Sequence, residues 1–155
     1  MSPEKNFYNR LRNNLSGNLV HLQRIESGTG QGIPDVNYCI LGAEGWIELK
    51  SFTRKNKKGT VRIPKLRDKQ CAWLFRRRMC RGRAYLLCEI NDDIALIDGL
   101  LAPQLLTGNT TITWEQLPRF CIEYLQAPDL DWSRLTRALS TFPPDVSIAG
   151  FKPRD

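Results

Sequence analysis

Apolar side chains at regular intervals predict the helices of this chain. Phe7, Leu11 and Leu15 recur every four residues, which is typical of a helix with one buried face. Ser2 is a favourable N-cap for that helix, and Pro3 suits its first position. In a second helix the residues Leu66, Gln70, Trp73, Leu74 and Arg77 share one face. We expect helices over residues 3–15, 66–81 and 130–142.

Short runs rich in β-branched and aromatic residues, bounded by turn residues, predict the strands. Strands are expected over residues 19–26, 36–41, 46–50, 84–90 and 94–97, with turns at 42–45 and 91–93. The first three strands form a predicted meander, and the apolar run 84–90 suits the middle of a sheet. Residues 53–65 form a basic loop that is long for a connection, which indicates function or mobility.

The positive charge of the chain is concentrated in one segment. Residues 50–83 hold fourteen of the 23 Lys and Arg residues and one of the 16 Asp and Glu residues. Residues 84–155 are acidic, with five basic and ten acidic side chains. A solvated surface would explain a mild excess, but such a concentration favours a face that binds a polyanion, and nucleic acid is the leading candidate.

The cysteines and histidine argue against a zinc or disulfide protein. The five cysteines form no C-x-x-C pair, and His21 is the single histidine. The N-terminus lacks an apolar signal segment, and no stretch is long and apolar enough to span a bilayer, so a cytoplasmic protein with free thiols is expected. A bound metal would be held by oxygen ligands, which suits Mg²⁺ or Mn²⁺.

Three residues carry the candidate chemistry. Glu48 and Lys50 alternate along a predicted strand and therefore lie on one face, while Asp35 begins the neighbouring strand. The two carboxylates, with the backbone carbonyl of Leu49, predict a hard oxygen site for a divalent cation. Such a site can activate water and neutralise a phosphodiester, and Lys50 can orient the water or balance developing charge. Pro-Asp and Glu-x-Lys also occur by chance, so a structural role is the alternative.

The segments GIPDVNYCILGAEGWIELK and LRDKQCAWLFRRRMCRGRAYLL resemble the PD-(D/E)XK nuclease superfamily. Within it, the similarity is to small virus-type replication-repair nucleases and to phage or archaeal Holliday-junction resolvases, and it covers roughly residues 4–98. The resemblance implies a restriction-endonuclease-like αβββαβ core, α/β in class, with a central mixed sheet flanked by helices. It implies that Asp35 and Glu48 bind the metal, that Lys50 assists the water, and that Gln70 orients Lys50, the water or the phosphate.

Many members of that superfamily add an acidic residue from the first helix. Glu4 matches by its order in the chain and by its face, although a glutamate in a first turn also stabilises a helix by itself. Glu26 is the rival, because it precedes the glycine-rich turn 27–32 and can face the site. The sequence does not decide between the two.

The basic segment supplies the candidate phosphate contacts. The loop offers flexible candidates and the end of the second helix more ordered ones: Arg54, Lys55, Lys57, Lys58, Arg62, Lys65, Arg76, Arg77, Arg78, Arg81 and Arg83. Trp73 and Trp46 favour core packing over base stacking.

These features predict residues 1–98 as the nuclease core and residues 99–155 as a helical C-terminal extension packed on the same domain. In that extension Thr113 and Gln116 resemble a capping box, although Pro118 opposes a helix there, and residues 141–155 read as an irregular tail. The favoured function is Mg²⁺- or Mn²⁺-dependent hydrolysis of branched or structured DNA by an endonuclease, and the resemblance to resolvases implies a homodimer. The alternatives are a non-catalytic nucleic-acid-binding module and a phage protein that binds a host protein through the acidic C-terminal third.

Overall fold

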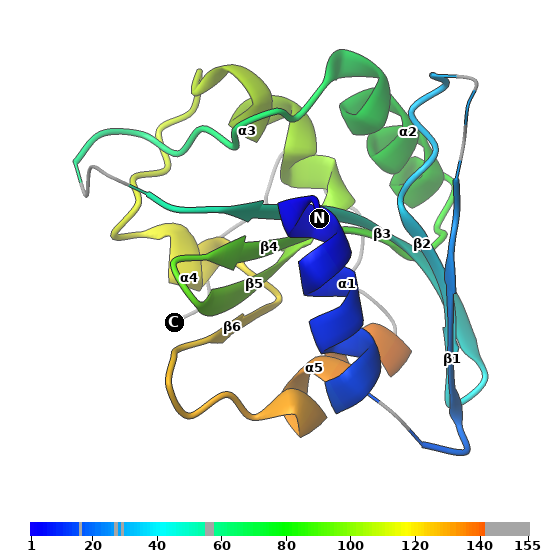
Figure 1. Cartoon of the computed structure of the whole chain (residues 1–155). Helices are drawn as coiled ribbons and strands as arrows, with labels where there is room; N and C mark the ends of the chain where they lie inside the picture. Colours follow the sequence, from blue (N-terminus) through cyan, green and yellow to red (C-terminus); the bar gives the residue numbers. More distant parts are fainter. Residues whose placement is uncertain (16, 27, 29, 55–57, 142–155) are drawn as a thin grey trace.

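A computed structural model of the chain describes residues 1–15, 17–26, 28, 30–54 and 58–141. Its centre is a six-stranded mixed sheet with the strand order β1-β2-β3-β4-β5-β6, flanked by helices on both faces (Figure 1). Among the strand pairs of the described residues, β3–β4 alone is parallel, and the helix α2 lies between these two strands in the chain. The predicted α/β class with a mixed sheet is therefore confirmed. None of the helices in the described part of the chain has the length and apolar character that a bilayer span requires.

The N-terminal half follows the predicted order of elements. The elements are α1 (Pro3–Asn14), β1 (Val20–Arg24), β2 (Val36–Ile40), β3 (Ala43–Phe52), α2 (Asp68–Met79) and β4 (Ala84–Ile90). The Ser2 side chain accepts a hydrogen bond from the backbone of Lys5, which confirms the N-cap. The strands β1, β2 and β3 pair antiparallel, as the predicted meander requires.

The turn between β2 and β3 lies earlier than the sequence analysis placed it. Ile40 pairs with Ala43, so the turn consists of Leu41 and Gly42, both with positive φ (52° and 81°). Two successive left-handed residues define the tight hairpin turn whose twist matches the strands. Ala43 and Gly45 therefore belong to β3, which extends to Phe52 and not to Lys50.

The C-terminal segment is part of the sheet and not only a helical addition. Its elements are β5 (Asp93–Asp98), η1 (Gly99–Leu101), α3 (Ala102–Thr107), α4 (Leu117–Phe120), β6 (Glu123–Leu125) and α5 (Trp132–Ser140). The predicted capping box is present, because Thr113 and Gln116 exchange hydrogen bonds of 3.2 and 3.3 Å, and Pro118 occupies the first turn of α4. Phe142, the predicted end of the last helix, and residues 142–155 lie outside the described residues.

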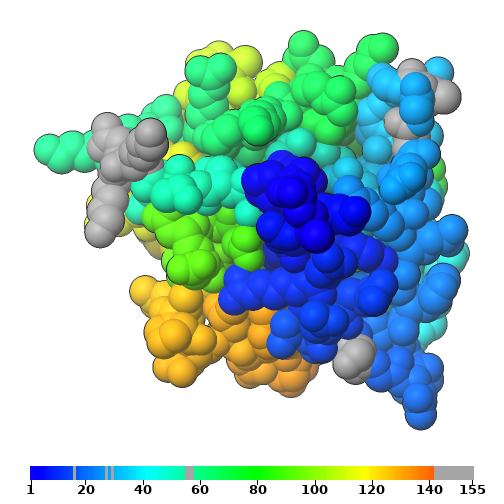
Figure 2. Space-filling model, viewed as in Figure 1, coloured from blue at the N-terminus to red at the C-terminus, as the bar shows by residue number. Residues whose placement is uncertain are grey.

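Two hydrophobic cores lie on opposite faces of the sheet. On one face α1 and α5 pack against Ile47 and Leu49, and Figure 2 shows α1 lying across the surface with α5 below it. On the other face α2, α3 and α4 pack against β4 and β5. The phenol of Tyr38 donates a 2.8 Å hydrogen bond to the carbonyl of Leu139, which ties α5 to the hairpin.

The basic loop after β3 is anchored and not free along its described part. Val61 and Ile63 are fully buried, and their amides donate to the carbonyls of Ile112 and Leu105 at 2.9 and 2.8 Å. Because side chains alternate along this extended segment, Arg62 between them points outward and is exposed. The C-terminal segment therefore holds the basic loop in place.

Candidate active site

The strand β3 places Glu48 and Lys50 on the face that α2 covers. Ile47 and Leu49 are 1% exposed and join the opposite core, as the predicted alternation requires. Glu48 is also 1% exposed and Lys50 6%, so both charges are buried. Lys50 Nζ lies 3.1 Å from Glu48 Oε1 and compensates part of the cost of burying the carboxylate.

Asp35 lies at the end of the β2–β3 pairing, beside Glu48. Val36 pairs with Ile47, so continuing the register places Asp35 opposite Glu48. Beyond this point β2 no longer pairs with β3, and the backbone amide of Leu49 instead donates to Asp35 Oδ2 at 2.8 Å. A strand residue directs its N–H and C=O to the same edge, so the Leu49 carbonyl faces the edge that Asp35 occupies.

Gln70 connects α2 to this pair of carboxylates. Its Nε2 donates to Glu48 Oε1 at 2.5 Å, and its Oε1 accepts a 3.0 Å hydrogen bond from the Arg67 amide. The second contact is a helix-capping interaction, and it fixes the amide so that its NH₂ group faces Glu48. Gln70 is 5% exposed and therefore has little freedom to leave this position.

The glycine-rich turn before Asp35 packs directly on the start of α2. Gly32 has φ +75°. A Cβ built on it would lie 2.3 Å from the backbone carbonyl oxygen of Lys69 and 2.9 Å from the backbone nitrogen of Gln70. Both the backbone conformation and the close approach require glycine. This contact holds the segment leading to Asp35 against the segment that carries Gln70.

Burial dominates the electrostatics of Glu48. Burial, reinforced by the nearby Asp35 carboxylate and partly offset by Lys50, raises the pKa of Glu48 from 4.5 to about 7. Glu48 Oε2 is buried and has no hydrogen-bond partner in the described part of the protein. An unpartnered carboxylate oxygen beside a second carboxylate fits a divalent cation, so Asp35, Glu48 and the Leu49 carbonyl form an oxygen donor set of the kind Mg²⁺ or Mn²⁺ prefers.

Within the part of the chain that the structure describes, no further acidic side chain is grouped with Asp35 and Glu48. Glu4 is half-buried on α1, which packs on the opposite face of the sheet from the Glu48 side chain, and Glu26 is exposed after β1. Among the described residues, no three His, Cys, Asp or Glu side chains gather in a way that could hold a metal ion. Asp35 and Glu48 therefore stand as a pair.

Most predicted phosphate contacts are at the surface, but Arg78 is not. The exposed members are Lys58, Arg62, Lys65, Arg76, Arg77 and Arg81; Arg54 and Arg83 are half-buried, and Lys55 and Lys57 lie outside the described residues. Arg78 is 1% exposed and binds Asp98 through two hydrogen bonds of 2.8 and 3.1 Å. The prediction for Arg78 was wrong because the buried face of α2 runs through Cys71, Leu74 and Arg78, while Arg77 lies outside it.

Two basic residues near the site were missed. Arg67 and Lys69 are exposed at the start of α2, beside the residue that contacts Glu48. Their position in the sequence, three residues and one residue before Gln70, was the available signal. Both are exposed basic residues, which adds them to the phosphate-contact candidates.

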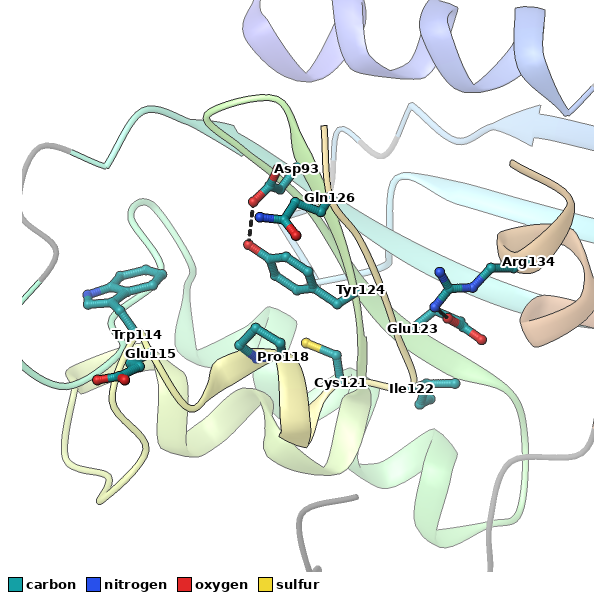
Figure 3. A pocket seen from close by; sticks show the side chains of 10 residues that line it. All are labelled: Asp93, Trp114, Glu115, Pro118, Cys121, Ile122, Glu123, Tyr124, Gln126 and Arg134. Carbon is teal, nitrogen blue, oxygen red and sulfur yellow. Dashed lines mark hydrogen bonds and ion pairs between the residues drawn. The ribbon is translucent and has the colours of Figure 1, made fainter. Parts of the chain in front are cut away.

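A separate hollow of about 520 Å³ lies at the β6 end of the sheet (Figure 3). Its acidic side chains are largely engaged: Asp93 accepts hydrogen bonds from the Tyr124 phenol and the Ala127 amide, and Glu123 pairs with Arg134 at 2.6 Å. Glu115 also lines it. Binding of a host protein through the acidic C-terminal third stays a hypothesis.

Comparison with known proteins finds no family model that matches the chain and no curated protein that matches its sequence.

Proposed function

We propose that this protein is a metal-dependent nuclease that hydrolyses phosphodiester bonds in DNA. One observation carries the proposal: Asp35 and Glu48 lie side by side next to Lys50, and the buried Oε2 of Glu48 has no hydrogen-bond partner among the described residues. A purely structural ion pair gains nothing from leaving a carboxylate oxygen buried and unsatisfied. A cation between the two carboxylates would remove that cost.

The order of the elements supports a restriction-endonuclease-like core as part of this proposal. An αβββαβ arrangement corresponds here to α1, the β1–β2–β3 meander, α2 and β4. In the resemblance to the PD-(D/E)XK superfamily, the acidic pair and the lysine lie on the second and third strands and the glutamine on the following helix. Glu48 and Lys50 lie on β3 and Gln70 lies on α2, while Asp35 immediately precedes β2.

In the proposed mechanism Asp35, Glu48 and the Leu49 carbonyl hold Mg²⁺ or Mn²⁺. The bound cation would supply an activated water and neutralise charge on the phosphate. Gln70 holds Glu48 in one orientation, and the raised pKa of Glu48 means that this residue must lose its proton before it becomes a good ligand. Lys50 stabilises negative charge that develops next to Glu48, and the exposed basic side chains hold the nucleic-acid backbone.

The proposal also includes a preference for branched or structured DNA and a homodimeric state, and both of these parts come from the resemblance alone.

The test uses labelled linear, closed circular, nicked, flap and four-way-junction DNA with Mg²⁺, Mn²⁺ or EDTA. We expect cleavage that needs the metal and is abolished in Asp35→Ala and Lys50→Ala. Cleavage of closed circles identifies an endonuclease. Binding of every substrate without cleavage under any metal would instead favour a non-catalytic nucleic-acid-binding module.

Matched variants separate the site from general charge effects. Glu44 is exposed on the same strand as Glu48, so Glu44→Gln is the control for Glu48→Gln, and Lys5→Ala on α1 is the control for Lys50→Ala. Cation binding has its own readout, because a ligand that binds only the native state raises the melting temperature. Mn²⁺ should raise it in wild type and Glu44→Gln but not in Asp35→Ala.

A further inference from the structure

Two tryptophans and an arginine form a cluster at the surface next to the acidic pair. The rings of Trp46 and Trp73 meet edge to face with their centroids 5.2 Å apart. The Arg77 guanidinium lies over both rings, at 4.6 Å from the Trp73 centroid and 5.9 Å from that of Trp46. Both tryptophans are half-buried and Arg77 is exposed, so the cluster presents planar groups to solvent. We call these three residues the aromatic platform.

The same two elements carry the platform and the acidic pair. On β3, Trp46 is two residues before Glu48 and on the same face, a separation of roughly 6.6 Å along the strand. On α2, Trp73 is three residues after Gln70, about 4.5 Å along the helix axis. The helix α2 and the strand β3 therefore meet at two neighbouring contacts, one between Gln70 and Glu48 and the next between Trp73 and Trp46. Measured along the two elements, the platform therefore begins roughly 5 to 7 Å from the residues of the site.

A hollow opens beside the platform and is positively charged. It has a volume of about 440 Å³ and is lined by Trp73, Arg76, Arg77, Cys80 and Gly82. Arg76 and Arg77 both line it, and none of the described residues that line it is acidic. A cation over an indole ring adds structural stability, but that role does not require a second arginine or a hollow. Stacking surfaces combined with positive charge are the features that bind unpaired nucleotides.

We propose that the aromatic platform stacks an unpaired nucleobase next to the phosphate that the acidic pair attacks, so that the substrate is nucleic acid containing unpaired nucleotides. This inference rests on the proposed nuclease function. Away from the ends of a duplex both faces of a paired base are covered by its neighbours, so at such positions only an unpaired base can offer a face to Trp73 or Arg77. Arg76 is placed to contact the phosphate of that nucleotide.

The test measures binding in EDTA, where no cleavage occurs. The probes are two oligonucleotide duplexes of equal length, one with a single unpaired 2-aminopurine and one with the 2-aminopurine paired. Stacking quenches 2-aminopurine fluorescence, and one stacked base corresponds to roughly 5- to 150-fold tighter binding. We expect quenching and a preference of this size for the unpaired probe. Equal affinity for both probes without quenching would overturn the inference.

Arg77→Lys is the decisive variant, because it keeps the charge and removes the planar group. We expect it to lose most of the quenching and of the preference for the unpaired probe, and Trp73→Phe to weaken both. Arg12→Lys, an exposed arginine on α1, is the matched control and should behave as wild type. An Arg77→Lys variant that keeps the full preference would contradict the inference.

The two proposals fail in different ways. If no metal supports cleavage but the unpaired base is still quenched, the nuclease proposal fails and the platform remains a nucleic-acid-binding site. If the wild type cleaves DNA and Arg77→Lys cleaves paired and unpaired substrates with the wild-type preference, the inference about the platform fails alone.

Discussion

Gln70 donates its side-chain amide to Glu48 across the space between α2 and β3, with 2.5 Å between Nε2 and Oε1. The other end of the same amide caps the helix by accepting from the Arg67 backbone. The first turn of α2 therefore determines the orientation of Glu48, and only one of the two carboxylate oxygens is left without a partner among the described residues. This relationship makes the site sensitive to changes that leave its charged residues intact.

Replacing Gln70 by glutamate should disable the site at neutral and higher pH. The new carboxylate would face Glu48 at hydrogen-bond distance, and like charges so close disfavour each other's ionised form. We expect cleavage to fall at least tenfold at pH 8 and the melting temperature to drop. The drop in melting temperature should shrink at pH 5, where a protonated carboxyl can donate as the amide does. Gln23→Glu, at an exposed position on β1, is the control, and an equal loss in both variants would contradict the assignment.

Glu48 should make the stability of the metal-free protein fall as pH rises. Folding raises the pKa of Glu48 from 4.5 to about 7, mainly because burial penalises the charged form. The native state binds more protons than the unfolded chain between these values, so a contribution that is complete below 4.5 is lost as pH rises through 7. This contribution of Glu48 to the free energy of unfolding is on the order of 3 kcal/mol. Metal-dependent cleavage should rise over the same window, because the cation requires the ionised carboxylate.

Denaturant unfolding in EDTA between pH 4.5 and 8 measures this dependence. We expect the free energy of unfolding to change less with pH in Glu48→Gln than in wild type, whereas Glu44→Gln keeps the wild-type slope. The variants are compared by how steeply the free energy of unfolding changes with pH and not by its absolute value, because Glu48→Gln also removes the partner of Lys50. A wild-type slope in Glu48→Gln would show that another group titrates.

Arg78 should matter for stability and not for nucleic-acid affinity. Its two hydrogen bonds to Asp98 are buried, and removing one partner of such a pair typically costs about 3–5 kcal/mol. We expect Arg78→Met to lose that amount in denaturant unfolding, and Arg78→Met with Asp98→Asn to recover part of it. Arg76→Met, at an exposed neighbour, should instead weaken DNA binding at low salt with little change in stability. The reverse pattern would contradict the buried assignment.

Two glycines of the turn before Asp35 should respond differently to alanine. Gly30 has φ +64° and open space around it, so Gly30→Ala should cost only the left-handed backbone penalty of about 1–2 kcal/mol. Gly32→Ala adds a collision with the Lys69 carbonyl, and we expect a loss of roughly 3 kcal/mol or more together with loss of cleavage. Unfolding and cleavage assays on both variants test this. Equal effects would show that the turn does not position the site.

The local pattern of the sequence was sufficient for the elements and for the face of β3. Phe7 and Leu11 predicted α1 because a helix repeats every 3.6 residues, and alternation placed Glu48 and Lys50 together because strand side chains repeat every two. The hairpin turn was placed too late, since Ala43 and Gly45 suit a turn as well as a strand. Nothing local distinguished Leu41 as a turn residue.

Tertiary structure alone decided the environment of each charge. Arg76, Arg77 and Arg78 are consecutive and chemically identical, yet only Arg78 is buried, because its direction on α2 meets Asp98, twenty residues later in the chain. The raised pKa of Glu48 and its unpartnered oxygen depend on how closely α2 packs over β3, which no spacing in the sequence encodes. The sequence by itself thus determined which groups share a strand or helix face, because that depends on backbone periodicity. Burial and pairing depend on contacts between distant segments, and only the folded chain could decide them.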